Sequence, residues 1–215
     1  SMYGDWSEAY LFTTPSLPAT LPFVCDFEDP AESTRWSFVD GAGTNVFTIG
    51  TNTSAVYAGA NALYVTNNRT SGTYTYSTGS ATRAYAFRTI HFESKGYQVN
   101  FKFKVTGGEG NWDFGRIFLT NATTALPASE AGSSYSSTTF PTTVAEFDGQ
   151  FLYSGSNPQL SGYTYAVGNP DANGWVSVSY FLDMTTKAEG DYNFVVMWSN
   201  DGSSGNQSPL AVDNI

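Results

Sequence analysis

Alternation of apolar and polar side chains is clearest between residues 97 and 105. The aromatic and aliphatic side chains occupy every second position of this segment: Tyr97, Val99, Phe101, Phe103 and Val105. Polar residues fill the positions between them. Successive side chains of a strand point to opposite faces, so this spacing predicts a strand with one buried face. Strands of this kind are typical of antiparallel sheets that expose their other face.

Similar short segments recur along the chain between turns rich in glycine, asparagine and proline, and none has a helical period. The predicted strands are 21–28, 36–39, 46–49, 62–66, 84–92, 97–105, 114–119, 144–153, 175–182, 192–198 and 210–215. About ten strands without a helix predict an all-β, two-sheet antiparallel jelly-roll β-sandwich. Residues 1–20 are predicted to be a lead-in or linker, and 21–215 one jelly-roll domain.

Three polar stretches separate these strands. Residues 67–81 carry Tyr74 and Tyr76 in alternation and are predicted to form an exposed hairpin. The segments 120–143 and 154–174 are predicted to be long loops. Loops of this length are usually functional or disordered.

The two ends of the chain are predicted to be neighbouring strands. Alternation places Phe23, Cys25 and Phe27 on one face, so that Asp26 and Glu28 point to the other. A further carboxylate lies in the closing segment 210–215, at Asp213. If the end strands pair, these carboxylates converge, and clustered oxygen ligands suit Ca²⁺. The alternative is that Glu28 and Asp213 cap turns or pair with an arginine such as Arg35 or Arg88.

Composition narrows the possible partners. The net charge is −10 and charged residues make up 13% of the chain, which disfavours nucleic acid or an anionic membrane as a partner. The single cysteine, Cys25, excludes an intrachain disulfide and is predicted to be an inert core residue. No transmembrane run is present, so no membrane insertion is expected.

Two features could carry catalysis. Glu146 and Asp148 lie two residues apart, as in the Glu-x-Asp-x-x-Glu strand of laminarinase-like retaining glycosidases, but Phe151 stands where the second glutamate belongs. The missing carboxylate removes the acid/base. The one histidine, His91, has no recognisable Ser-His-Asp surroundings and is predicted to be packed and hydrogen-bonded. The sequence therefore predicts a protein that is not an enzyme.

Exposed aromatic residues in loops favour recognition instead. Sugar-binding modules stack sugar rings on such side chains, with amides and carboxylates supplying hydrogen bonds. The predicted ligand-binding residues are Trp112, Tyr135, Tyr163 and Tyr165. Trp36 and Trp198 lie in strand patterns and are predicted to be core.

Several short motifs, taken in order, resemble the bacterial cleaved-adhesin and MAM-like jelly-roll domains of Bacteroidetes-type surface proteins. They are Asp26-Phe27-Glu28-Asp29, Trp36, 59–65, 97–101, 192–200 and 211–215. The resemblance implies a structural Ca²⁺ near the first and last strands, carried here by Glu28, the turn that includes Asn61, and Asp213. It also implies an extracellular or cell-surface location, with the signal peptide removed.

The sequence thus predicts a non-catalytic surface module that binds glycan or protein. One alternative is a glycoside-active β-sandwich enzyme, which needs a second carboxylate brought to Glu146 and Asp148 from a distant strand. The other is a structural spacer or anchor within a larger surface protein, which would lack an aromatic-lined groove.

Overall fold

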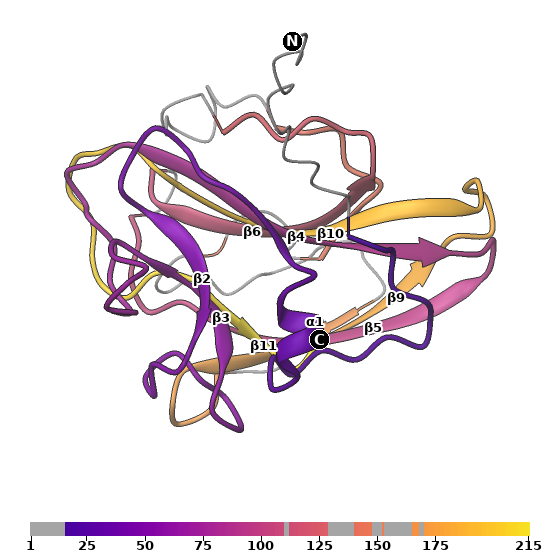
Figure 1. Ribbon diagram of the computed structural model, residues 1–215, viewed down its shortest axis with the longest axis horizontal. Coiled ribbons are helices and arrows are strands. Elements are labelled where there is room, and N and C mark those ends of the chain that lie inside the picture. The colour runs from indigo at the N-terminus through magenta and orange to yellow at the C-terminus, as the bar shows by residue number, and fades with distance from the viewer. Residues whose placement is uncertain (1–15, 110–111, 129–139, 148–151, 153–164, 168–169) are drawn as a thin grey trace, which may run out of the picture.

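The chain folds into two antiparallel sheets packed face to face (Figure 1). The computed structural model describes residues 16–109, 112–128, 140–147, 152, 165–167 and 170–215. Sheet A has the order β1 (Ser37–Val39), β4 (Thr82–Phe92), β10 (Gly190–Asn200), β6 (Phe114–Asn121), β7 (Ala145–Glu146). Sheet B has the order β2 (Val46–Gly50), β3 (Ala62–Thr66), β11 (Ala211–Asp213), β5 (Gly96–Lys104), β9 (Trp175–Asp183), β8 (Tyr165–Val167). Each sheet interleaves early and late strands, and the predicted sandwich class is confirmed.

The main core fills the space between the sheets. On β5, Phe101 and Phe103 are buried, as the alternation predicts, while Gln98 and Asn100 are exposed. Trp36 and Trp198 are also buried, which confirms their predicted place in the core.

A second apolar cluster covers the outer face of sheet A. Tyr85, Phe114, Phe118, Val195 and Met197 point outward from β4, β6 and β10, and Ala128, Leu126 and Phe140 pack on them from the connection between β6 and β7. The described parts of the predicted loop 120–143 therefore cover a sheet face. This explains why β6 and β10 are buried on both sides.

The chain ends are neighbours, although the first stretch is not a regular strand. Cys25 and Ile215 exchange backbone hydrogen bonds of 2.8 and 2.9 Å, while Ala19 bridges to Ile90. The predicted alternation holds, because Cys25 and Phe27 are each 2% exposed. Residues 21–28 do not form the regular strand that was predicted, because Phe27 adopts a left-handed backbone conformation (φ 62°).

One short helix, α1 (Pro30–Ser33), follows this stretch and was not predicted. The Asp29 carboxylate caps it by accepting the Ala31 N–H at 2.9 Å, and Pro30 fits the first turn. Within the described residues, no helix is long and apolar enough to cross a membrane.

The prediction of an exposed hairpin at 67–81 was wrong. Tyr74 and Tyr76 are 5% and 2% exposed. The Tyr74 hydroxyl donates to the Pro209 carbonyl and the Tyr76 hydroxyl to Asp113, both at 2.7 Å. These bonds allow tyrosines with polar neighbours to be buried.

Candidate functional site

The predicted calcium residues lie together, where two carboxylates fasten the loop 51–61. The Glu28 Oε1 accepts the backbone N–H groups of Ala60 and Asn61 at 2.8 and 2.7 Å, and Oε2 accepts the Asn61 side-chain amide at 3.2 Å. Gly59, which immediately precedes Ala60, has φ 76°, and a Cβ there would lie 2.5 Å from the Glu28 Oε1. The approach of this loop to Glu28 therefore requires glycine.

Asp213 fastens the same loop from the other end of the chain. Its Oδ2 accepts the N–H groups of Tyr57 and Ala58 at 2.9 and 3.3 Å, and its Oδ1 accepts the N–H of Asn214 at 2.8 Å. The side chain is completely buried. Burial raises the pKa of Asp213, and the negative charge of Glu28 adds to that rise. The N–H groups of Asn61 and Ala60 lower the pKa of Glu28.

Glu28 and Asp213 accept hydrogen bonds from loop N–H groups. Both carboxylates therefore cap turns, as one of the sequence-based alternatives predicted. Arg35 and Arg88 instead pair with Glu32. Within the described residues, no group of three or more His, Cys, Asp or Glu side chains is placed to hold a metal.

The residues nonetheless fit a calcium ion that also draws on amide or backbone oxygens. The buried Asp213 carboxylate lies near the like charge of Glu28, and no Lys, Arg or His of the described residues forms an ion pair with either. The Asn61 side-chain amide donates its N–H to Glu28. Turning the amide group over exchanges its nitrogen and oxygen, so that the oxygen would face an ion beside Glu28. Calcium accepts such mixed oxygen sets.

An open groove of about 470 Å³ runs along the side of the sandwich where the edge strands β1 and β2 face each other. Pro30 and Ser33 of helix α1 form part of its lining. We call it the β1–β2 groove; its lining includes Phe27, Glu28, Phe38, Thr48, Asn61 and Arg69. The predicted calcium residues Glu28 and Asn61 thus also form part of its wall.

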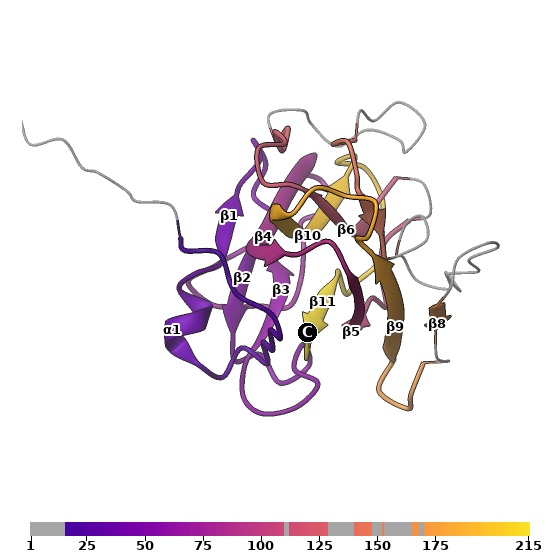
Figure 2. The same cartoon turned by 90° about the vertical axis from the view of Figure 1, so that its right-hand side faces the viewer.

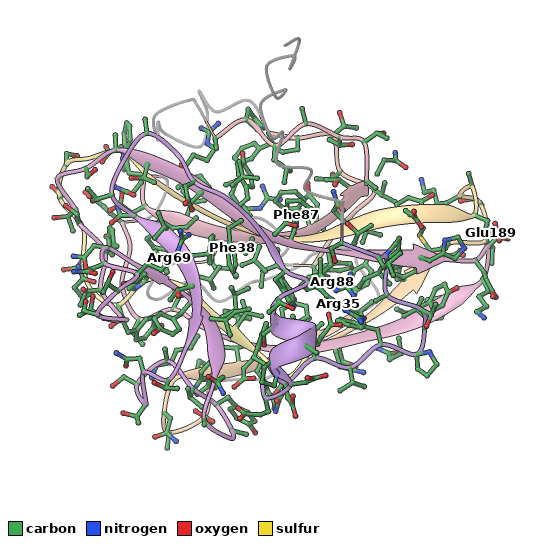
Figure 3. The ribbon with its side chains drawn as sticks, in the orientation of Figure 1. Arg35, Phe38, Arg69, Phe87, Arg88 and Glu189 are labelled. Carbon is green, nitrogen blue, oxygen red and sulfur yellow. The ribbon has the colours of Figure 1, made fainter. Side chains whose placement is uncertain are left out.

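Four hydrogen bonds hold the Arg69 side chain in this groove. Its guanidinium forms a bidentate pair with Asp40 at 2.8 and 3.1 Å, and it donates twice to the Phe47 carbonyl at 2.9 and 3.1 Å. These bonds use four of its five N–H groups. The guanidinium also lies 5.4 Å from the centre of the Phe38 ring, beside which Figure 3 shows it. The cation is therefore fixed before any ligand arrives.

A second hollow of about 370 Å³ continues past Arg69 and shares Thr48, Ile49 and Arg69 with the groove. Its remaining lining is mostly polar, including Thr51, Asn52, Thr70 and Ser71. The two hollows together form a long surface along β2 that offers hydroxyl, amide and guanidinium groups. Such a surface can hold an extended polar molecule.

The carboxylates at the groove do not form an acid/base pair. Glu28 has a lowered pKa and is ionised, which does not suit a general acid. Asp40 is engaged on both oxygens by Arg69. Neither carboxylate is therefore placed to act as a general acid.

The predicted ligand-binding aromatics do not form one site in the described part of the chain. Trp112 is 46% exposed before β6 and lines neither hollow. Tyr165 begins β8, opposite Tyr180. Tyr135 and Tyr163 lie outside the described residues.

The residues weighed for catalysis have other partners. Glu146 contacts Arg116 at 3.2 Å, and Asp148 lies outside the described residues. His91 is hydrogen-bonded, as predicted, to Asp191 at 2.8 Å. Its side chain is nevertheless 41% exposed, so the predicted packing of His91 was wrong. Asp191 raises the pKa of His91.

Sequence reasoning missed Phe38, Asp40 and Arg69. Phe38 alternates with Trp36 and shares its predicted face, but β1 is an edge strand, so Phe38 is 37% exposed where Trp36 is 4% exposed. Nothing in the sequence links Asp40 to Arg69. The available signal was an aromatic residue on a short strand followed by an acidic turn.

Comparisons with protein-family models, with curated proteins and with solved structures gave no match for this chain.

Proposed function

We propose that this protein is a non-catalytic recognition module that binds a glycan in the β1–β2 groove. The observation that carries the proposal is the fixed Phe38–Arg69 pair, which lies in the β1–β2 groove and beside the mostly polar second hollow. An aromatic ring offers a surface on which the apolar face of a sugar stacks. The neighbouring hydroxyls, amides and the remaining Arg69 N–H supply hydrogen bonds to sugar hydroxyls.

The likeness of the sequence motifs to adhesin-type domains supports the same function at a cell surface or outside the cell. A recognition module could bind a protein instead of a glycan, and a structural spacer would bind neither. A glycoside-active enzyme at this groove would also need a protonated carboxyl group as its acid, and the lowered pKa of Glu28 does not suit that role.

Replacing Phe38 with alanine is expected to weaken glycan binding about tenfold, or about 1.4 kcal/mol. The parent protein would first be screened on a broad polysaccharide panel, with each well assayed for released sugar. Affinity for the best ligand would then be measured by calorimetry. Trp112→Ala is the matched control, because it removes an exposed aromatic ring outside the groove.

Loss of affinity in Trp112→Ala but not in Phe38→Ala would contradict the assignment of the groove. Release of sugar by the parent protein would favour the enzyme. Absence of binding across the panel would favour the protein-ligand or spacer alternative.

We also propose that a structural Ca²⁺ is held by Glu28, Asn61 and Asp213. Calcium that binds only the folded protein stabilises it by about 2.7 kcal/mol at about a hundred times its Kd. We therefore expect calcium to raise the melting temperature of the parent protein, and EDTA to reverse the rise. Asp213→Asn should abolish the response, while Asp183→Asn, which removes an exposed carboxylate elsewhere, should keep it.

The calcium response is expected to depend on pH. Calcium needs the ionised form of Asp213, whose pKa is raised by burial. Calcium stabilisation should therefore be present above the folded-state pKa and be lost as the pH falls through it. Without calcium, the raised pKa adds stability below the unfolded-state pKa, and this contribution is lost as the pH rises through the folded-state value. A calcium response equal in the parent and in Asp213→Asn would refute the site.

A further inference from the structure

A second surface lies on the outer face of sheet B, apart from the β1–β2 groove. Over β3 and β11 this face is covered by a cluster that includes Ala55, Tyr64 and Trp175. Over β5 and β9, which lie side by side in Figure 2, exposed side chains remain. We call this part the β5–β9 shelf and define it by Tyr57, Gln98, Asn100, Lys102, Ser179 and Phe181.

The middle of the shelf is an oriented chain of hydrogen bonds. The Gln98 amide N–H donates to the Ser179 hydroxyl at 3.0 Å, and that hydroxyl donates to the Asn100 amide oxygen at 2.9 Å. The Asn100 NH₂ group and the Gln98 oxygen are left facing outward, since both residues are exposed. The two amides therefore leave three N–H donors, two from Asn100 and one from Gln98, and the carbonyl oxygen of Gln98 as an acceptor.

Lys102 stands at one end of this chain without a carboxylate partner. Its ammonium donates to the Ser177 hydroxyl and lies 4.7 Å from the centre of the Tyr57 ring. Asp213 is its cross-strand neighbour, but the Asp213 carboxylate accepts N–H groups of residues 57, 58 and 214 and forms no ion pair with Lys102. Asp171 is close enough for Lys102 to help lower its pKa, yet it forms no ion pair with Lys102 within 4 Å.

In this chain of net charge −10, the surface cations Arg35, Arg69 and Lys95 pair with the carboxylates of Glu32, Asp40 and Glu93. Lys102, like Lys104 and Lys187, forms no ion pair within 4 Å in the described part of the chain. The ammonium of Lys102 has three N–H donors, and the Ser177 hydroxyl takes one of them. The charge of Lys102 is therefore complementary to an acidic ligand.

Phe181 stands at the other end of the shelf and is 51% exposed. Its ring lies over Gly96, where a Cβ would approach a ring carbon to 2.6 Å. The glycine lets the ring lie across the neighbouring strand, and half of the side chain remains open to solvent. Phe181 and Ser177 are four residues apart on β9, which is about 14 Å along a strand.

We propose that the β5–β9 shelf binds a carboxylated sugar chain. A sugar ring stacks on Phe181, hydroxyl groups bond to Asn100 and Gln98, and a uronate carboxylate pairs with Lys102. The shelf shares no residue with the β1–β2 groove, so the two proposals stand or fall separately.

The test uses uronate oligosaccharides built from galacturonate, glucuronate or guluronate, each compared with its methyl ester. Binding is measured by calorimetry in EDTA, so that calcium cannot bridge protein and ligand. The parent protein is expected to bind at least one acid form and to bind its ester at least tenfold more weakly. Affinity should also fall when salt rises from about 50 to about 300 mM, because added ions screen the charge pair.

Lys102→Gln is expected to weaken binding of the acid form by about tenfold or more, since bonds to charged groups are the stronger ones. Lys187→Gln removes the same charge from an exposed site away from the shelf and should leave the affinity unchanged. Phe181→Ala should weaken binding of the acid and of the ester by the same factor. Unchanged melting temperatures would confirm that these variants fold.

Three results would overturn the proposal. They are equal affinity for acid and ester, an unchanged affinity in Lys102→Gln, and no binding of any of the three uronate chains at millimolar concentration. Binding lost in Phe38→Ala but kept in Lys102→Gln would place the acidic chain in the β1–β2 groove.

Discussion

Replacing Arg88 with methionine is expected to lower the free energy of unfolding by about 3–5 kcal/mol, because it breaks a buried ion pair by removing one partner. Arg88 is completely buried, and its cross-strand neighbour Phe194 belongs to the core between the sheets. Its guanidinium contacts the Glu32 carboxylate at 2.5 and 3.2 Å and donates to the Leu17 carbonyl at 2.8 Å. Methionine fills much of the space but leaves Glu32 and the carbonyl without these donors.

The effect of Arg88 on stability should extend to the first residues of the described chain. The guanidinium lies 5.8 Å from the centre of the Phe23 ring and holds both Leu17 and α1 against β4. Urea unfolding followed by tryptophan fluorescence measures the loss. Arg35→Gln is the matched control, because Arg35 is half exposed and 3.7 Å from the same Glu32 carboxylate. Removing this surface pair should cost less than about 1 kcal/mol.

A double-mutant cycle separates the ion pair from simple packing. Glu32→Gln alone should also destabilise the protein, and the double variant should lose less than the sum of the two single losses. A loss below about 1 kcal/mol for Arg88→Met, or strictly additive losses, would show that the pair does not hold the first segment in place.

The sequence predicted the sandwich because short apolar segments recur between turns without a helical period, and because the segment that became β5 alternates as one-sided strands do. It did not predict Arg88 in the core, since a buried arginine depends on Glu32, which lies 56 residues away. The prediction that Tyr74 and Tyr76 lie on an exposed hairpin was wrong for a similar reason. Their hydroxyl partners, Pro209 and Asp113, lie far along the chain, and local polarity does not reveal them.

The candidate site likewise contains residues that the sequence predicted and residues that it did not. Glu28 and Asp213 were predicted to converge because the chain ends pair, and Asn61 was added by the family resemblance. The structure brings all three to one loop. The Phe38–Arg69 pair was missed because it joins an edge strand to a turn that follows β3. Contacts between two such segments leave no periodic signal in either one.

The segment around β7 makes a contribution to the fold that can be measured. The motif at Glu146 was considered for catalysis, and the residue after it, Phe147, is completely buried. Its N–H donates to the Ile117 carbonyl at 2.9 Å. The part of the segment 144–153 near Phe147 therefore contributes a core side chain.

Phe147→Ala is expected to lower the free energy of unfolding by about 3–5 kcal/mol, the usual cost of emptying the space of a buried phenylalanine. The Phe147 ring stacks on Phe194 of sheet A at 5.5 Å and meets Tyr180 and Phe101 of sheet B edge-on at 5.1 and 6.4 Å. It thus contacts both sheets, and alanine leaves a cavity that neither sheet can close alone. Chemical unfolding measures the loss, and Val24→Ala, at a site that is 78% exposed, should change stability by less than about 0.5 kcal/mol. A loss for Phe147→Ala no larger than that control would mean that the ring does not join the sheets. A large loss with unchanged affinity of the folded variant for its glycan would show that this segment serves the fold rather than the site.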